Sequence, residues 1–569
     1  MEEQKKVLQE GLNYLKANKL NPAIDIFNKI LNESPNNYEA NFYLGTIYAK
    51  LNDTSKALEF LKKTSEINPS NPDVYNNLGI VNLNLKKFDE AAKYFEQSIK
   101  LKKNFTIAIC NLGIALNNLN KAQQAKEKFS FVIQLDPKNI LANYNLGCIF
   151  KREGNQKEAE KYLFKAINLS PKFLPAYNNL LEIFDKSNQN TKLDEFLKKA
   201  ENFFPNNPVI ILFRARYFYK IKKYNDVIKL LINIKFDQSE IFHEQAKLEI
   251  IAKSYDHLKD YENSFNYFVK SNEVSGKINP YNADKNIFFN LVEKKLDFFT
   301  NKNLKNWKKI DSQNLQDPVF LVGFPRSGTT LLDTILRTHP LIEVIEEKPI
   351  VDRFVVKLEE EINSDLSKLA NIDEKFYMKM RKTYFDLRNE SHEVDSEKLC
   401  IDKMPLNLIF IGEIIRFFPN AKFIFALRHP YDCVLSCFMQ NFRLNNAMAT
   451  FLKLEDAAKS YNLVMTLWEN LRNNIDINYH QIKYEDLVAD FDNTVKNLLK
   501  FLEVDWDQNL KKFYETAGKR GIMNTPSYNQ VSQPIYSKSI NRWKNYETKF
   551  ENSKVLLDPW VKKFNYNQN

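Results

Sequence analysis

The sequence predicts an α-solenoid of helical repeats followed by an α/β domain with a mostly parallel sheet. Two observations carry this prediction: small residues recur every 34 residues in the first half, and a glycine-bracketed octapeptide begins at Gly323. A chain of 569 residues is too long for one hydrophobic core. We therefore expect a repeat region at 1–276, a helical connector at 277–316 and an α/β domain at 317–569.

The first half of the chain contains one repeating pattern of small residues. A 34-residue period with small residues at two positions, aromatics between them and a closing proline is typical of tetratricopeptide repeats. The small residues let the paired helices approach closely, and proline stops the second helix. The glycines are Gly11, Gly45, Gly79, Gly113 and Gly147, the alanines are Ala23, Ala57, Ala91, Ala125 and Ala159, and the prolines are Pro35, Pro69, Pro137, Pro171 and Pro205.

The repeats are predicted to stack into a superhelix, because one unit cannot bury its own apolar face. Five clear units run from Gln4 to Phe173, a weaker one reaches Asn207, and one or two degenerate helical pairs reach about Gly276. A concave surface of this kind predicts a protein partner. The connector, Lys277 to Gln316, is rich in Asn and Lys and contains a helical segment near 288–299.

The octapeptide Gly323-Phe-Pro-Arg-Ser-Gly-Thr-Thr330 predicts a phosphate-binding loop. It lies between a strand-like run, Val319 to Val322, and a helix-like run, Leu331 to Leu336. Backbone N–H groups and the following helix N-terminus favour phosphate at such a place. The loop is only P-loop-like, because Gly328-Thr329-Thr330 stands where nucleoside triphosphatases have Gly-Lys-Ser/Thr. We therefore expect a nucleotide other than a nucleoside triphosphate.

A second phosphate site is predicted after the strand-like run Lys422 to Leu427. This run delivers Arg428 to a turn, and a helix that opens near Pro430 carries Ser436. A cation at a helix N-terminus opposes the helix dipole unless an anion is present. The pattern therefore favours an anionic ligand over simple capping.

Together, the loop and the Arg428/Ser436 pair resemble the 5′-phosphosulfate and 3′-phosphate sites of sulfotransferases that use 3′-phosphoadenosine 5′-phosphosulfate (PAPS). The likeness is to the tyrosylprotein sulfotransferase branch and its bacterial relatives with tetratricopeptide repeats, and it covers roughly Asp317 to the C-terminus. Domain 317–569 is thus identified as a sulfotransferase domain.

Further residues match the family in order. Glu347 lies 21 residues after Arg326, as the family's catalytic glutamate does, and Lys403 matches a family lysine before an Asp-Pro-like pair, with Met404 for the commoner Asp. Tyr484 matches a family tyrosine. The segment from Ser527 to Arg542 resembles a C-terminal cofactor clamp, although the family has lysine where this chain has Arg542.

The resemblance implies a role for each residue. Glu347 is the candidate general base, and Arg326, Lys403 and Ser527 face the charge on the sulfonyl group and bridging oxygen. No metal is implied. The implied catalytic residues are Glu347, Lys403 and Arg326, and the implied cofactor-binding residues are Arg326, Ser327, Gly328, Thr329, Thr330, Arg428, Ser436, Tyr484, Ser527 and Arg542.

Each of these residues also has a plainer interpretation. Glu347 could be a solvated surface charge, Lys403 a strand-end charge and Tyr484 a core side chain. His339 and His429 each precede a proline in a turn and are interpreted as structural. Two other functions stay open: a kinase- or phosphatase-like nucleotide enzyme, and a repeat scaffold with a catalytically inactive domain.

Composition excludes several classes. The net charge of +11 is spread along the chain, so nucleic acid is not an expected partner. The five cysteines form no CxxC pair, which argues against a disulfide framework or zinc. No signal peptide and no run of 18 apolar residues is found, so we expect a cytoplasmic protein without a membrane partner. The acceptor hydroxyl is open between protein tyrosine, a glycan and a small alcohol.

Overall fold

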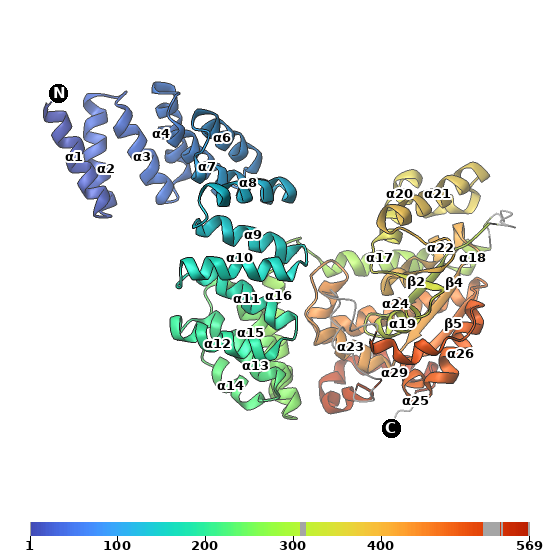
Figure 1. Ribbon diagram of the computed structural model, residues 1–569. Coiled ribbons are helices and arrows are strands. Elements are labelled where there is room, and N and C mark those ends of the chain that lie inside the picture. The colour runs from blue at the N-terminus through green and yellow to red at the C-terminus, as the bar shows by residue number, and fades with distance from the viewer. Residues whose placement is uncertain (1, 306, 308–314, 516–534, 536–538, 567–569) are drawn as a thin grey trace. The chain divides into compact units, whose positions relative to one another are not determined.

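The computed structural model describes residues 2–305, 307, 315–515, 535 and 539–566 (Figure 1). Contacts within the chain divide it into two units, Met1–Tyr217 and Phe218–Asn569. The predicted repeat boundary at 276 therefore falls inside the second unit. Among the described residues, no helix is both long and apolar enough to cross a membrane.

The first unit is built of consecutive helices that pack in pairs, as the 34-residue period predicts. The predicted solenoid is confirmed. Its helices are α1 Glu2–Lys16, α2 Leu20–Glu33, α3 Tyr38–Lys50, α4 Thr54–Ile67, α5 Pro72–Asn84, α6 Phe88–Leu101, α7 Thr106–Asn118, α8 Ala122–Leu135, α9 Ile140–Arg152, α10 Gln156–Leu169, α11 Leu174–Lys186, α12 Asn190–Phe203 and α13 Pro208–Lys220.

The repeated glycines pack against a large side chain of the partner helix. A Cβ atom on Gly113 would lie 2.8 Å from the Phe129 ring, and one on Gly45 would lie 2.7 Å from Leu61 Cγ. Such distances are closer than packed carbon atoms tolerate. The glycine period therefore marks the closest approach of the two helices in each pair.

The second unit begins with helices that join the core of the sheet domain. Phe268, Phe288 and Val292 belong to the same buried cluster as Phe320 of the sheet. The Asn272 side-chain amide also donates a hydrogen bond of 2.9 Å to the Phe438 carbonyl. These helices are α14 Tyr224–Leu231, α15 Ile241–His257, α16 Tyr261–Lys277, α17 Lys285–Phe298 and α18 Asn301–Leu304.

A five-stranded sheet of order β2-β3-β1-β4-β5 forms the centre of the second unit, and every pairing is parallel. The strands alternate with helices, as predicted. The segment before Glu347 is also a strand, which the sequence did not predict. The strands are β1 Val319–Gly323, β2 Ile342–Glu346, β3 Leu399–Lys403, β4 Lys422–Leu427 and β5 Tyr479–Lys483.

Side chains of the central strands alternate between two buried clusters. Phe320 and Val322 of β1 enter one cluster, whereas Val319 and Leu321 enter the other. This places helices on both faces of the sheet (Figure 1). The helices from α19 onward are α19 Thr329–Leu336, α20 Ile350–Ile362, α21 Glu374–Ser391, α22 Ile411–Phe417, α23 Pro430–Phe438, α24 Leu454–Asn474, α25 Tyr484–Ala489, α26 Phe491–Leu502 and α29 Lys554–Lys563, with 3-10 helices η2 Leu366–Asn371, η3 Pro405–Phe410, η4 Met448–Leu452, η5 Gln508–Lys512 and η6 Arg542–Ser553. A further 3-10 helix, η1 Gln238–Glu240, lies between α14 and α15.

Candidate active site

The loop between β1 and α19 turns tightly against its neighbours. Gly328 has a φ of +100°, and a Cβ atom there would lie 3.0 Å from the Tyr484 ring. A Cβ atom on Gly323 would lie 2.5 Å from the Ala426 carbonyl oxygen. Both glycines are therefore required by the backbone path, and they leave the loop N–H groups at the start of α19.

Two buried polar groups beside this loop fit an anionic ligand. Ser327 is 2% exposed and Arg428 is 8% exposed. Within the part of the chain that the structure describes, Ser327 Oγ and Arg428 Nε have no hydrogen-bond partner. Buried polar atoms are normally paired, so these two are well placed to bind the phosphates of a nucleotide.

The Arg428 guanidinium is fixed from several sides. It donates to the Arg326 carbonyl at 3.2 Å and the Ser539 carbonyl at 2.5 Å, and it lies 5.1 Å from the Tyr484 ring centre. Burial lowers the pKa of Arg428, but nearby acidic groups, led by Asp432, outweigh burial and raise it above its usual value. The group is therefore a permanent cation.

Arg326 joins the two predicted phosphate sites. Its Nε donates a 3.0 Å hydrogen bond to Ser436 Oγ, and its carbonyl accepts from Arg428. Arg326 also has a φ of +70°, an uncommon conformation for a residue other than glycine. The structure thus brings Arg326, Arg428 and Ser436 together.

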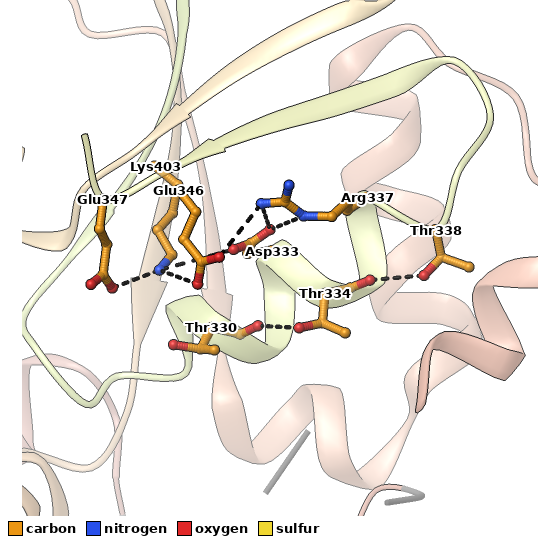
Figure 2. A network of polar contacts seen from close by, with 8 residues as sticks. All are labelled: Thr330, Asp333, Thr334, Arg337, Thr338, Glu346, Glu347 and Lys403. Carbon is orange, nitrogen blue, oxygen red and sulfur yellow. Dashed lines mark hydrogen bonds and ion pairs between the residues drawn. The ribbon is translucent and has the colours of Figure 1, made fainter. Parts of the chain in front are cut away.

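Lys403 ends β3 and lies among three carboxylates (Figure 2). Its side chain is fully buried, and its Nζ lies 2.7 Å from Glu347 Oε1, 3.7 Å from Glu346 Oε1 and 4.0 Å from Asp333 Oδ2. Strand pairing sets this arrangement, because Lys403 is in register with Leu321 on one side and with Glu346 on the other.

Glu347 follows β2 in a left-handed conformation with a φ of +49°. Its N–H donates to the Lys403 carbonyl at 2.8 Å, while its side chain is 40% exposed. Backbone strain in a glutamate that is held on both its backbone and side chain is a frequent mark of a functional residue.

These groups surround one cavity of about 670 Å³. Its polar lining includes the loop, Glu347, Arg428 and Tyr484, and its apolar lining includes residues of α17 in the predicted connector. Lys403 pairs with Glu347 and does not line the cavity. The apolar lining residues include Phe288, Leu291, Met404, Leu406, Ile409, Phe410, Phe442 and Met448.

One predicted cofactor residue, Arg542, lies away from the cavity. Arg542 pairs with Asp256 of α15 at 2.9 Å and does not line the cavity. Ser527 lies outside the described residues. Thr329 and Thr330 both line the cavity, as their place in the loop predicts.

The two histidines have structural surroundings. His339 Nε2 lies 2.9 Å from the Asp505 carbonyl oxygen, and His429 stacks on Trp543 with ring centres 5.2 Å apart. Burial, followed by the Arg428 charge, lowers the pKa of His429 to about 4. His429 is therefore neutral near pH 7.

The sequence analysis missed Asp333, Arg337 and Glu346. Asp333 Oδ1 accepts hydrogen bonds from Arg337 Nε at 2.9 Å and Nη2 at 2.7 Å, and burial raises the pKa of Asp333. A sequence pattern could have indicated the Asp333–Arg337 pair, because an aspartate interrupts the apolar run of α19 and an arginine follows four residues later.

Models of known protein families match both halves of the chain. Residues 318–508 match the sulfotransferase family. In the first half, residues 140–173 match the tetratricopeptide repeat, and residues 16–98 match the family described as anaphase-promoting complex, cyclosome, subunit 3. The chain thus combines tetratricopeptide repeats with a sulfotransferase-family domain, as its motifs predict.

Individual relatives are distant. The chain is 26% identical to an uncharacterized protein of Aquifex aeolicus (strain VF5), over 55% of this chain and 42% of that protein. It is 26% identical to the protein-tyrosine sulfotransferase of Drosophila melanogaster over 42% of this chain and 49% of that one, and 26% identical to human protein-tyrosine sulfotransferase 1 over 40% and 62%. The chain therefore spans about half the length of these relatives.

Solved structures match over shorter regions. MamA is 26% identical, with a TM-score of 0.27, and the match covers 28% of this chain and 95% of MamA. PilW, titled a widely conserved type IV pilus biogenesis factor, is 18% identical with a TM-score of 0.35, over 37% of this chain and 97% of PilW.

Proposed function

We propose that the chain transfers a sulfuryl group from PAPS to a hydroxyl acceptor. The observation that carries this proposal is that Arg326 and Glu347 line one cavity and that the buried Lys403 pairs with Glu347 at 2.7 Å. The match to the sulfotransferase family and the relatives named protein-tyrosine sulfotransferase support it.

The two phosphate ends of the cofactor have separate sites in this proposal. The loop N–H groups and the hydroxyls of Ser327, Thr329 and Thr330 hold the 5′-phosphate end. Arg428, assisted by Ser436, holds the 3′-phosphate, and Tyr484 packs beside the adenosine. The unpaired Ser327 Oγ and Arg428 Nε support this division, because each leaves a donor for a ligand.

The catalytic residues act on charge and on one proton. PAPS supplies an activated sulfuryl group whose leaving phosphate oxygen gathers negative charge. Lys403 and Arg326 offset that charge by electrostatic stabilisation. Glu347 takes the proton of the acceptor hydroxyl, a role that fits a partly exposed carboxylate on the cavity wall.

The acceptor packs against the apolar part of the cavity lining. Phe288, Phe410 and Phe442 belong to this lining, and aromatic side chains pack favourably against a phenol ring. We therefore place protein tyrosine first among the three acceptor classes. The repeats recruit or orient this protein acceptor through their concave face.

The direct test is thermal unfolding of the full chain with 3′-phosphoadenosine 5′-phosphate (PAP), the desulfonated cofactor. PAP is expected to raise the melting temperature by mass action without added metal, and ATP is expected to do far less. Equal stabilisation by ATP and PAP, or a strict need for magnesium, would favour a kinase-like enzyme. No response to PAP would favour the inactive scaffold.

The repeat role has its own test. Transfer of labelled sulfate from PAPS into a lysate is compared for the full chain and for a chain that begins at Phe218, which keeps the α17 wall of the cavity. Loss of protein labelling with unchanged PAP binding supports recruitment by the repeats. Equal labelling of protein by both chains contradicts it.

A further inference from the structure

Asp333 is a fully buried carboxylate on α19, seven residues after Arg326. Its two oxygens face different cations. Oδ1 accepts both hydrogen bonds from Arg337, whereas Oδ2 lies 4.0 Å from Lys403 Nζ. Oδ2 has no hydrogen-bond partner among the residues that the structure describes.

The two sides of Lys403 differ in their number of carboxylates (Figure 2). Glu347 lies on the cavity side, at 2.7 Å, and Asp333 and Glu346 lie on the other. With Arg337, the cluster contains two cations and three carboxylates. Lys403 can therefore keep a carboxylate neighbour even when Glu347 takes the proton of the acceptor.

The proposed chemistry makes opposing demands on the Lys403–Glu347 pair. Glu347 has to take a proton from the acceptor, yet its Oε1 accepts a hydrogen bond from Lys403. A buried ammonium group left without a counter-ion is costly. Lys403 thus needs another carboxylate during the step in which Glu347 acts.

We propose that Asp333, fixed by Arg337, is the positioning residue that holds Lys403 charged and in place while Glu347 acts as the base. This inference rests on the proposed function. Arg337 orients the carboxylate through Oδ1 and leaves Oδ2 directed at Lys403. Glu346 assists from 3.7 Å but is partly exposed, so Asp333 is the only one of the three carboxylates shielded fully from solvent.

Asp333→Asn separates positioning from a plain structural role. The amide oxygen can still accept from Arg337, but the charge that faces Lys403 is lost. The matched control is Asp317→Asn, which makes the same change in a buried carboxylate that accepts from Arg381 at 2.6 Å. Asp317 precedes β1 and does not line the cavity.

The first experiment uses the protein without cofactor. Asp333→Asn is expected to lower the melting temperature of the otherwise unchanged chain by about 2–4 °C and to leave it unchanged or higher in a Lys403→Met background, where Arg337 is the one cation that the described cluster keeps for its three carboxylates. Asp317→Asn is expected to lower it equally in both backgrounds. An equal loss from Asp333→Asn in both backgrounds would overturn the pairing.

The second experiment measures PAP binding by calorimetry and sulfate transfer from PAPS. Asp333→Asn is expected to slow transfer about 10- to 100-fold, to keep the PAP dissociation constant within about 3-fold, and to cause no further loss in the Lys403→Met background. Full transfer, or a loss that adds to that of Lys403→Met, overturns the inference. A wild-type chain that neither binds PAP nor transfers sulfate overturns the proposed function instead, while the melting experiment still judges the pairing.

Discussion

The lysine end and the arginine end of the candidate site differ in what neutralises their buried cations. Lys403 has three carboxylates within 4.0 Å, whereas Arg428 contacts two backbone carbonyls and an aromatic ring. Across the residues described, Arg428 has no ion-pair partner. A buried guanidinium whose nearby acidic groups, led by Asp432, form no direct ion pair with it has a place for an anion from a ligand, whereas a lysine already in contact with carboxylates does not.

The difference between the two ends predicts that one controls cofactor binding and the other controls the chemical step. The arginine end should control the affinity for a nucleotide, because its charge is available to phosphate. The lysine end should control the rate, because its cation and carboxylates can exchange partners as charge develops. Substitutions at the two ends should therefore affect different measured quantities.

The largest expected effect is at the lysine end. Glu347→Ala removes the proposed base, so turnover with saturating PAPS is expected to fall by roughly 10²- to 10⁴-fold while PAP affinity changes only a few-fold. Steady-state transfer and PAP calorimetry measure the two. Glu390→Ala, at an exposed glutamate that pairs with Arg353, is the control and should change neither. If Glu347→Ala weakened PAP binding as severely as Arg428→Ala does, the two ends would not differ in function.

The next effect is at the arginine end. Arg428→Ala removes charge-assisted hydrogen bonds to phosphate, so the PAP dissociation constant is expected to rise about 10- to 100-fold. Turnover at saturating cofactor should change much less. Calorimetry with Arg353→Ala as the exposed control tests this. Unchanged PAP affinity in Arg428→Ala would show that the buried guanidinium serves the fold alone.

The sequence predicted the arginine end better than the lysine end. Arg428 follows a strand and begins a helix, so its position depends on local elements that a short sequence pattern reveals. The surroundings of Lys403 depend on β2 pairing with β3, and β2 was not predicted. Asp333 and Glu346 come near Lys403 only through that register and the packing of α19.

A similar limit applies to the helices before the sheet. The period predicted the repeat helices because each glycine faces a side chain in its own pair, a local contact. No local pattern predicted that Phe268 and Phe288 enter the sheet domain's core, because that contact joins segments far apart in the chain. Arg542 was matched to a lysine of the family by spacing alone, and in the structure it pairs with Asp256.

The arginine end also predicts a pH effect on stability. The His429 pKa is about 4 in the folded chain and about 6.5 for an exposed histidine, so the unfolded chain binds more protons between these pH values and stability falls as pH falls below about 6.5. At pH 5 the loss from this group is about 2 kcal/mol.

His429→Phe should remove that loss while keeping the stack on Trp543. Both ring nitrogens of His429 lack hydrogen-bond partners within the described ranges, so phenylalanine forfeits no bond recorded there. Denaturant unfolding at pH 7 and pH 5 measures the difference. The wild-type chain is expected to lose about 2 kcal/mol more than the variant over this interval, and equal losses would contradict the lowered pKa.

The smallest expected effect tests whether an unpaired buried atom of the predicted phosphate-binding loop serves a ligand. Ser327 Oγ is buried without a hydrogen-bond partner in the described structure, so Ser327→Ala should leave the cofactor-free melting temperature unchanged or slightly higher. Loss of one hydrogen bond to phosphate, about 0.5–1.5 kcal/mol, should weaken PAP binding about 2- to 10-fold. Thr383→Ala, in which the lost hydroxyl donates to the Lys379 carbonyl on an exposed helix face, is the control and should leave PAP affinity unchanged. A lower melting temperature with unchanged PAP affinity would assign Ser327 to the fold, because the hydroxyl would then stabilise the free protein and not the complex.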